Sequence, residues 1–131
     1  MRIDIWSDIV CPFCYVGKRN LEQALAEFEH RDEVEVVWHS FELDPSATEY
    51  PAGSLPEMIA SKYQMPLEQA IATQESLAER AREVGLDFNW RQARYGNTFD
   101  AHRVIHYAAE QGLAAAAEEA FKKAYFTQGR S

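Results

Sequence analysis

The sequence predicts an α/β fold in which one strand–helix–strand unit is followed by a series of helices. Residues 2–6 (RIDIW) alternate polar and apolar side chains, which indicates a short strand. From Tyr15 to Phe28 the apolar residues recur at helical spacing. Residues 34–41 are rich in β-branched and aromatic side chains, which is typical of a second strand. A strand, a helix and a strand in this order form a βαβ unit, so we expect the two strands to be parallel.

The predicted series of helices begins after residue 44. Asp44 and Pro45 open a loop rich in turn residues, and apolar positions then recur at helical spacing. Gly85 is placed to end one helix, and Asn97 is a candidate N-cap with Asp100 three residues later. The expected helices are 55–64, 66–84, 97–111 and 113–126, and the stretch 86–95 is a connection anchored by Phe88 and Trp90.

Composition and charge limit what the protein can be. The chain has 131 residues, 47% hydrophobic and 12% aromatic, so it can bury one core and is not a disordered tail. A net charge of −8 disfavours nucleic acid as a partner, because a duplex is bound through a basic surface. No apolar stretch approaches the roughly 20 residues that cross a bilayer, and residues 1–6 are too charged for a secretory signal. We therefore predict a cytoplasmic protein without a membrane or nucleic-acid partner.

The two cysteines, Cys11 and Cys14, stand between the first strand and the first helix. They are too few for a disulfide scaffold, which leaves inert thiols, half of a zinc site, or a redox dithiol. Pro12 suits the first turn of a helix, where a missing N–H costs nothing, so Cys11 is expected at the helix N-terminus and Cys14 one turn in. A C-x-x-C beside a βαβ unit in a cytosolic protein favours the redox dithiol.

The helix N-terminus favours a negative charge at Cys11 through its unpaired N–H groups and its dipole. An ordinary thiol with a pKa of about 8.5 is only about 3% thiolate at pH 7, whereas a pKa of about 6 makes it about 90% thiolate. We expect Cys11 to attack a disulfide and Cys14 to resolve the mixed disulfide. Pro12 and Phe13 are predicted to support the site or contact substrate. Phe13 supplies no charge, which predicts a milder oxidant than a histidine at that position would give.

The histidines offer a weaker zinc hypothesis. His102 and His106 lie one helical turn apart, a valid ligand spacing, but their distance from Cys14 far exceeds the usual spacing of about 12–15 residues. Arg103 stands where a metalloprotease motif needs glutamate. We therefore predict no metal and no cofactor, and expect both side chains to be core or surface histidines.

We expect structural roles for several other side chains. We expect His39 to hydrogen bond to the backbone, and Trp6, Tyr15 and Trp38 to pack in the core. Arg103 is expected to form an ion pair. The acidic residues of the helices are expected to form a solvated surface; they are Glu75, Glu79, Glu83, Glu110, Glu118 and Glu119.

Four stretches of the sequence resemble one protein family. They are WSDIVCPFCYVGKRNLE, VVWHSFELDP, NTFDAHRVIHYA and FKKAYFTQGR, and they are similar to the DsbA-like branch of the thioredoxin superfamily, most closely to its cytoplasmic FrnE-type members associated with polyketide biosynthesis. The resemblance implies a thioredoxin-like part at residues 1–44 and an all-helical insertion at residues 45–131. It also implies a thiol–disulfide oxidoreductase or isomerase with Cys11 as nucleophile and Cys14 as resolving thiol. Protein or small-molecule thiols and disulfides are the implied substrates, and glutathione is one candidate.

The family's fold continues with further strands and a cis-proline that faces the dithiol. No proline follows Pro66 in this sequence, so we expect the chain to be the N-terminal part of a longer protein. Two other functions stay open. Related glutathione-dependent isomerases or transferases act on small aromatic substrates but use serine at the position of Cys11, so the dithiol favours exchange. A redox-switch binding module without catalysis is the third hypothesis.

Overall fold

The computed structural model describes residues 1–48 and 53–130. The chain begins with strand β1 (Arg2–Ser7), helix α1 (Pro12–Glu27), the short 3-10 helix η1 (Arg31–Glu33) and strand β2 (Glu35–Ser40). The remaining helices are α2 (Leu55–Lys62), α3 (Leu67–Glu83), α4 (Phe99–Glu110) and α5 (Ala114–Phe126). The predicted order of a βαβ unit followed by helices is confirmed.

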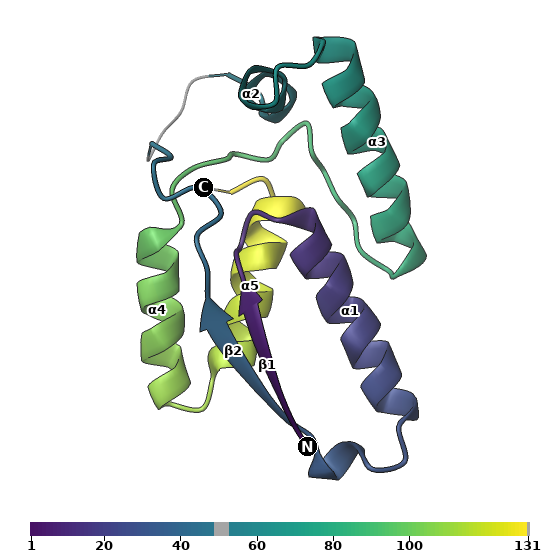
Figure 1. The fold of residues 1–131 in the computed structure, drawn as a ribbon, viewed down its shortest axis with the longest axis vertical. Coiled ribbons are helices and arrows are strands. Elements are labelled where there is room, and N and C mark those ends of the chain that lie inside the picture. Colours follow the sequence, from purple (N-terminus) through teal and green to yellow (C-terminus); the bar gives the residue numbers. More distant parts are fainter. Residues whose placement is uncertain (49–52, 131) are drawn as a thin grey trace.

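The two strands pair in parallel, with Arg2 opposite Glu35 and Ser7 opposite Ser40. In Figure 1, α1 and α4 flank the strands, and α2 and α3 lie beyond the C-terminal ends of both strands. The chain leaves β1 at this same end and turns directly into α1. The two cysteines therefore face the region between the βαβ unit and the helices that follow it.

The core lies among α1, α3, α5 and the connection between α3 and α4. Phe126 is its centre, because its ring contacts Tyr15, Phe88 and Tyr125 at centroid distances of 5.5, 5.0 and 4.6 Å. Phe88 and Trp90 are buried, so the predicted anchors of the connection are confirmed. Tyr15 is also buried as predicted. Helix α5 thus packs directly against the helix that begins at the dithiol.

The ends of the helices follow local side-chain chemistry. Ser54 and Glu57 form a capping box at α2, with N–H···O distances of 3.3 and 3.0 Å. The start of α4 differs from the prediction by one position: Thr98 is the N-cap, and the side-chain oxygen of Asn97 accepts the N–H of Phe99 at 2.9 Å. Asp100 does not close a capping box but pairs with Arg103 at 3.1 Å, which confirms the ion pair expected for Arg103.

Two aromatic predictions fail in the sheet, one on each face. Trp6 is 63% exposed rather than in the core, and Trp38 is only partly buried. His39 stacks on Trp6 at 4.5 Å and hydrogen bonds to the carboxylate of Asp4 at 2.7 Å, not to the backbone. Register explains the contact between them, because Trp6 and His39 are opposite one another on the same face, where none of the described helices buries Trp6. No helix of the described residues is long and apolar enough to cross a membrane.

Candidate active site

The predicted site residues lie together at the junction of β1 and α1. Cys11 is the N-cap of α1 with extended backbone, and Pro12 occupies the first turn, as its missing N–H requires. The carbonyl of Cys11 accepts the N–H of Cys14 at 3.1 Å and that of Tyr15 at 3.4 Å. Both cysteines are unbonded to each other and partly buried. Phe13 is 58% exposed, with the Arg80 guanidinium 5.6 Å from its ring centre.

The two thiols ionise as a pair, because the state of each sulfur changes the pKa of the other. Interaction with Cys11 lowers the pKa of Cys14 to about 6, aided by the backbone N–H of Asp8, the hydroxyl of Ser7 and the positive charge of Lys122. The same interaction, together with burial, raises the pKa of Cys11. The backbone N–H groups of Cys14 and Phe13 oppose that rise, so negative charge on either sulfur meets donors. The lowered pKa predicted for Cys11 alone therefore belongs to the pair, in which one sulfur ionises readily and the other does not.

A buried carboxylate links the dithiol loop to α4 and to the segment after β2. Asp8 is 2% exposed, and its oxygens accept the backbone N–H of Ile9 at 2.7 Å and of Leu43 at 2.9 Å. His102 of α4 hydrogen bonds to it at 3.0 Å. Burial alone would raise the pKa of Asp8, but these hydrogen bonds outweigh burial and lower it. The loop that carries Cys11 is thus held from two sides.

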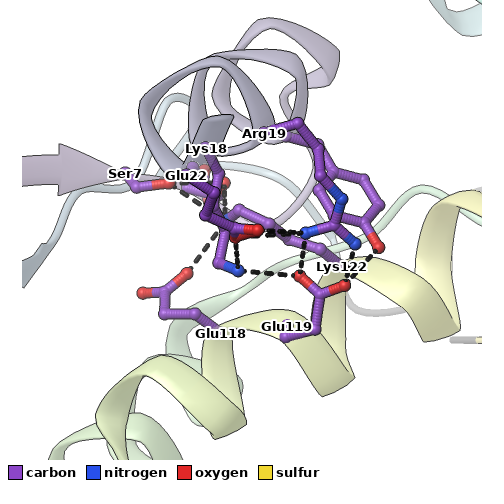
Figure 2. Close-up of polar contacts among 9 residues, drawn as sticks. Ser7, Lys18, Arg19, Glu22, Glu118, Glu119 and Lys122 are labelled. Carbon is purple, nitrogen blue, oxygen red and sulfur yellow. Dashed lines mark hydrogen bonds and ion pairs between the residues drawn. The ribbon is translucent and has the colours of Figure 1, made fainter. Parts of the chain in front are cut away.

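A buried lysine lies behind Cys14. The Nζ of Lys122, from α5, donates to the Ser7 hydroxyl at 3.0 Å, the Asp8 carbonyl at 3.1 Å and the Glu118 carboxylate at 2.8 Å. Lys122 and Glu118 are both 0% exposed. Figure 2 shows Lys122 between α5 and the end of β1, with Glu118 one helical turn away. The second oxygen of Glu118 has no partner among the described residues. The expectation that Glu118 lies on a solvated surface is therefore wrong.

A second ion-pair cluster fastens α1 to α5. Glu119 accepts hydrogen bonds from Lys18 at 2.9 Å, from Tyr15 at 3.1 Å and from Arg19. Figure 2 shows Lys18, Arg19 and Glu119 bridging the two helices. Burial opposes ionisation of Glu119, but the hydrogen bonds from Arg19 and Lys18 and the charges of both lower its pKa to about 2. The helix that begins at the dithiol is therefore held to α5 near its own N-terminus.

A largely apolar pocket of about 530 Å³ opens beside Cys11. Cys11, Pro12 and Phe13 form one edge, and α2, α3 and α5 supply the other walls. Cys14 does not line it. The structure thus brings three of the four predicted site residues to one cavity and places Cys14 behind them, against Ser7 and Lys122.

The remaining histidines are held by side chains. His102 is 4% exposed and paired with Asp8, while His106 contacts the Ser40 hydroxyl at 3.0 Å. Among residues 1–48 and 53–130, no three His, Cys, Asp or Glu side chains gather where they could hold a metal ion.

Sequence reasoning missed the groups that surround the dithiol. These are Ser7, Asp8, Gln74, Glu118 and Lys122, each 2% exposed or less. One signal was available for two of them: Glu118 and Lys122 stand four apart on one helix, the spacing of an ion pair. Nothing in the helical pattern indicated that this pair is buried.

Comparisons with known proteins show what the chain is similar to. Residues 2–131 match a family model described as the DSBA-like thioredoxin domain. An uncharacterised protein of Bacillus subtilis (strain 168), YwbO, is 34% identical over 112 residues, which are 84% of this chain and 48% of that protein. A solved structure, described as the probable DsbA oxidoreductase SCO1869 from Streptomyces coelicolor, is 46% identical with a TM-score of 0.93.

The Streptomyces structure also fixes the fold class. The match covers 100% of this chain and 56% of that one, so the chain spans about half the length of the relatives it matches. At this identity and TM-score, the predicted thioredoxin-like α/β fold with a helical insertion is confirmed.

Proposed function

Because the chain belongs to the family of DSBA-like thioredoxin domains, we propose that the protein is a thiol–disulfide oxidoreductase that works through Cys11 and Cys14. The observation that carries the proposal is the dithiol itself. Its two cysteines lie at the first turn of α1, and the pKa of Cys14 is lowered to about 6. A thiol with that pKa is about 90% ionised at pH 7, and the thiolate is the form that attacks disulfides. The match to a probable DsbA oxidoreductase supports the same chemistry.

Cys11 is the sulfur we assign to the first attack. It lines the open pocket, whereas Cys14 faces Ser7 and Lys122. Since the two thiols ionise as a coupled pair, the proton of Cys11 can pass to the Cys14 thiolate as Cys11 attacks. The charge that forms on Cys11 meets the N–H groups of Phe13 and Cys14. Cys14 then attacks the Cys11 sulfur and releases the mixed disulfide.

We assign the two segments of the chain different roles in this reaction. Residues 1–44 carry the dithiol, and residues 45–131 supply Lys122 and most of the pocket wall. FrnE-type specificity, isomerase activity and a cytoplasmic location are part of the same proposal, supported by the sequence resemblance. A reducing compartment would keep the dithiol in the reduced form that starts the reaction described here.

The test uses the reduced protein at full length with single cysteine variants. Cys14→Ser is expected to form a stable mixed disulfide with oxidised glutathione at Cys11, detected by mass spectrometry, since the resolving thiol is gone. Cys11→Ser is expected to form no such adduct at pH 7 and to lose turnover in insulin reduction. The wild-type protein with both thiols alkylated is the control for uncatalysed exchange.

Two results would contradict this assignment. Retained turnover in Cys11→Ser would show that exchange does not start at Cys11. An adduct on Cys14 in Cys11→Ser, with none on Cys11 in Cys14→Ser, would keep the oxidoreductase but exchange the roles of the two sulfurs.

A further inference from the structure

The pocket beside Cys11 has the dimensions of a small-molecule site. Its volume of about 530 Å³ falls within the roughly 300–1,000 Å³ of typical ligand pockets. Its walls are mainly apolar, with Leu55, Met58 and Phe88 among them. Cys11 lies at its edge, so a ligand that fills the pocket meets the sulfur assigned above to the first attack.

Two buried polar groups converge on this otherwise apolar cavity. Gln74 of α3 is 2% exposed and Tyr125 of α5 is 4% exposed, and both line the pocket. Within the described residues, neither the Gln74 amide nor the Tyr125 hydroxyl makes a hydrogen bond, and neither is a fully enclosed atom. Because they line the pocket and are not fully enclosed, their polar atoms can be reached from the cavity. These two are therefore available to a ligand that carries a donor and an acceptor.

The geometry points to a specificity site for a small aromatic or otherwise apolar disulfide, in which Gln74 and Tyr125 hydrogen bond to a polar group of the substrate while its disulfide lies against Cys11. This inference rests on the proposed oxidoreductase function and names its substrate class. One common mode of recognising an extended polypeptide uses main-chain hydrogen bonds along a strand edge. The pocket walls are mostly helix side chains, and its polar groups can be reached only by a group that enters the cavity.

The reaction at this site is a two-electron exchange. The Cys11 thiolate attacks one sulfur of the substrate R–S–S–R, forming the Cys11–S–S–R bond and releasing R–S⁻, which takes up a proton as R–SH. Cys14, which has received the proton of Cys11, loses it and attacks Cys11 as a thiolate, forming the Cys11–Cys14 disulfide and expelling a second R–S⁻. The cysteine pair loses two electrons to the substrate disulfide. One proton from the pair and one from solvent convert both R–S⁻ groups to R–SH.

The test measures the oxidation of the reduced full-length protein as a function of disulfide concentration. The probes are dithiodipyridine as an aromatic disulfide, hydroxyethyl disulfide as a small polar one, and insulin as a polypeptide. Tyr125→Phe removes one hydroxyl and little else, and Gln74→Leu removes the amide. Tyr107→Phe and Gln69→Leu are matched controls, because both residues are exposed and outside the pocket.

We expect the rate to saturate with dithiodipyridine and to rise linearly with hydroxyethyl disulfide. Each pocket variant should raise the half-saturation concentration about three- to tenfold, the effect of one lost hydrogen bond. The ratio of the dithiodipyridine rate to the hydroxyethyl disulfide rate, both at low concentration, should fall by the same factor in each pocket variant, and the control variants should match the wild type in both rates.

Three outcomes would overturn the inference. The first is a rate that stays linear with dithiodipyridine, and the second is an equal slowing of both small disulfides in the pocket variants. The third is saturation with insulin alone, which would assign the pocket to polypeptides. Failure of the proposed function would give a different result. The reduced wild-type protein would then react with all three probes no faster than Cys11→Ser does.

Discussion

Replacing Lys122 by methionine removes the positive charge behind Cys14 and keeps most of the side-chain volume. The lysine makes hydrogen bonds of 2.8, 3.0 and 3.1 Å from a position that is 0% exposed. Without it, the buried Glu118 carboxylate loses its cation, and Ser7 and Asp8 lose a donor. Breaking a buried ion pair from one side costs about 3–5 kcal/mol, a large part of the roughly 5–15 kcal/mol that stabilises a typical domain.

The double variant Lys122→Met/Glu118→Leu removes both members of the buried ion pair, so neither charge is left without its partner. Replacing both members of a buried pair by apolar residues is often neutral or stabilising by about 1–4 kcal/mol. The lost donor to Ser7 and Asp8 opposes this by about 1–3 kcal/mol, so we expect the double variant to lie within about 2 kcal/mol of the wild type. In both Lys122→Met and the double variant, the pKa of Cys14 should be higher than in the wild type, because the charge of Lys122 that lowers it is gone.

Urea unfolding monitored by tryptophan fluorescence gives the stabilities, and thiolate absorbance against pH gives the thiol pKa. Lys123→Met is the matched control, since Lys123 is the exposed neighbour on the same helix. The reasoning is refuted if Lys122→Met costs no more than Lys123→Met. It is also refuted if the double variant restores stability and leaves the thiol pKa at its wild-type value.

Three further predictions concern pH and the helices that hold the site. The exchange rate at fixed disulfide concentration should fall below pH 7 with a midpoint near the Cys14 pKa of about 6, measured by stopped-flow mixing. Glu119→Gln should destabilise the protein at neutral pH by about 1–2 kcal/mol, because the full pKa shift is reduced by solvent screening. That difference should be complete above about pH 4.5 and vanish towards pH 2, the lowered pKa of Glu119, in urea unfolding. Asn97→Ala should cost about 1 kcal/mol in the same assay, the usual effect of a lost helix cap.

Each of the two substitutions has a matched control. Glu79→Gln and Asn20→Ala change exposed residues of α3 and α1, so neither should alter stability by more than about 0.5 kcal/mol. A rate that does not change between pH 5 and pH 8 would contradict the low pKa of the dithiol. An effect of Glu119→Gln that persists at pH 2 would show that its carboxylate is not what fastens α1 to α5.

The elements of the fold were predictable because their signals are local. Alternation in residues 2–6, the helical spacing after Tyr15, and proline and glycine at helix ends each act within a few residues. The dithiol was predictable for the same reason, since Pro12 alone places Cys11 at the start of a helix. The start of α4 was missed by one residue because Asn97 and Thr98 are both good caps, and the contact of Asn97 with the loop after Asp44 favours Thr98.

The buried side chains around the dithiol could not be predicted from these local patterns. Glu118 and Glu119 are neighbours with the same side chain, yet one is 0% exposed and the other faces Lys18 and Arg19. The difference depends on which face of α5 meets the end of β1, a contact across more than a hundred residues. Hydrophobicity patterns also place charged residues at the surface of a helix. The burial of Glu118 is explained only by the partner that the tertiary structure brings to it.

One face of α5 contributes both to the buried ion pair behind Cys14 and to the pocket beside Cys11. Glu118, Lys122 and Tyr125 are spaced four and three apart, so they lie along one side of the helix. Lys122 holds the end of β1 behind Cys14, and Tyr125 forms a wall of the pocket beside Cys11. Adjacent Glu119 fastens the start of α1. The helical segment after β2 therefore contributes to both the charge of the dithiol and the shape of its pocket. A displacement of α5 would change the thiol pKa and substrate binding together.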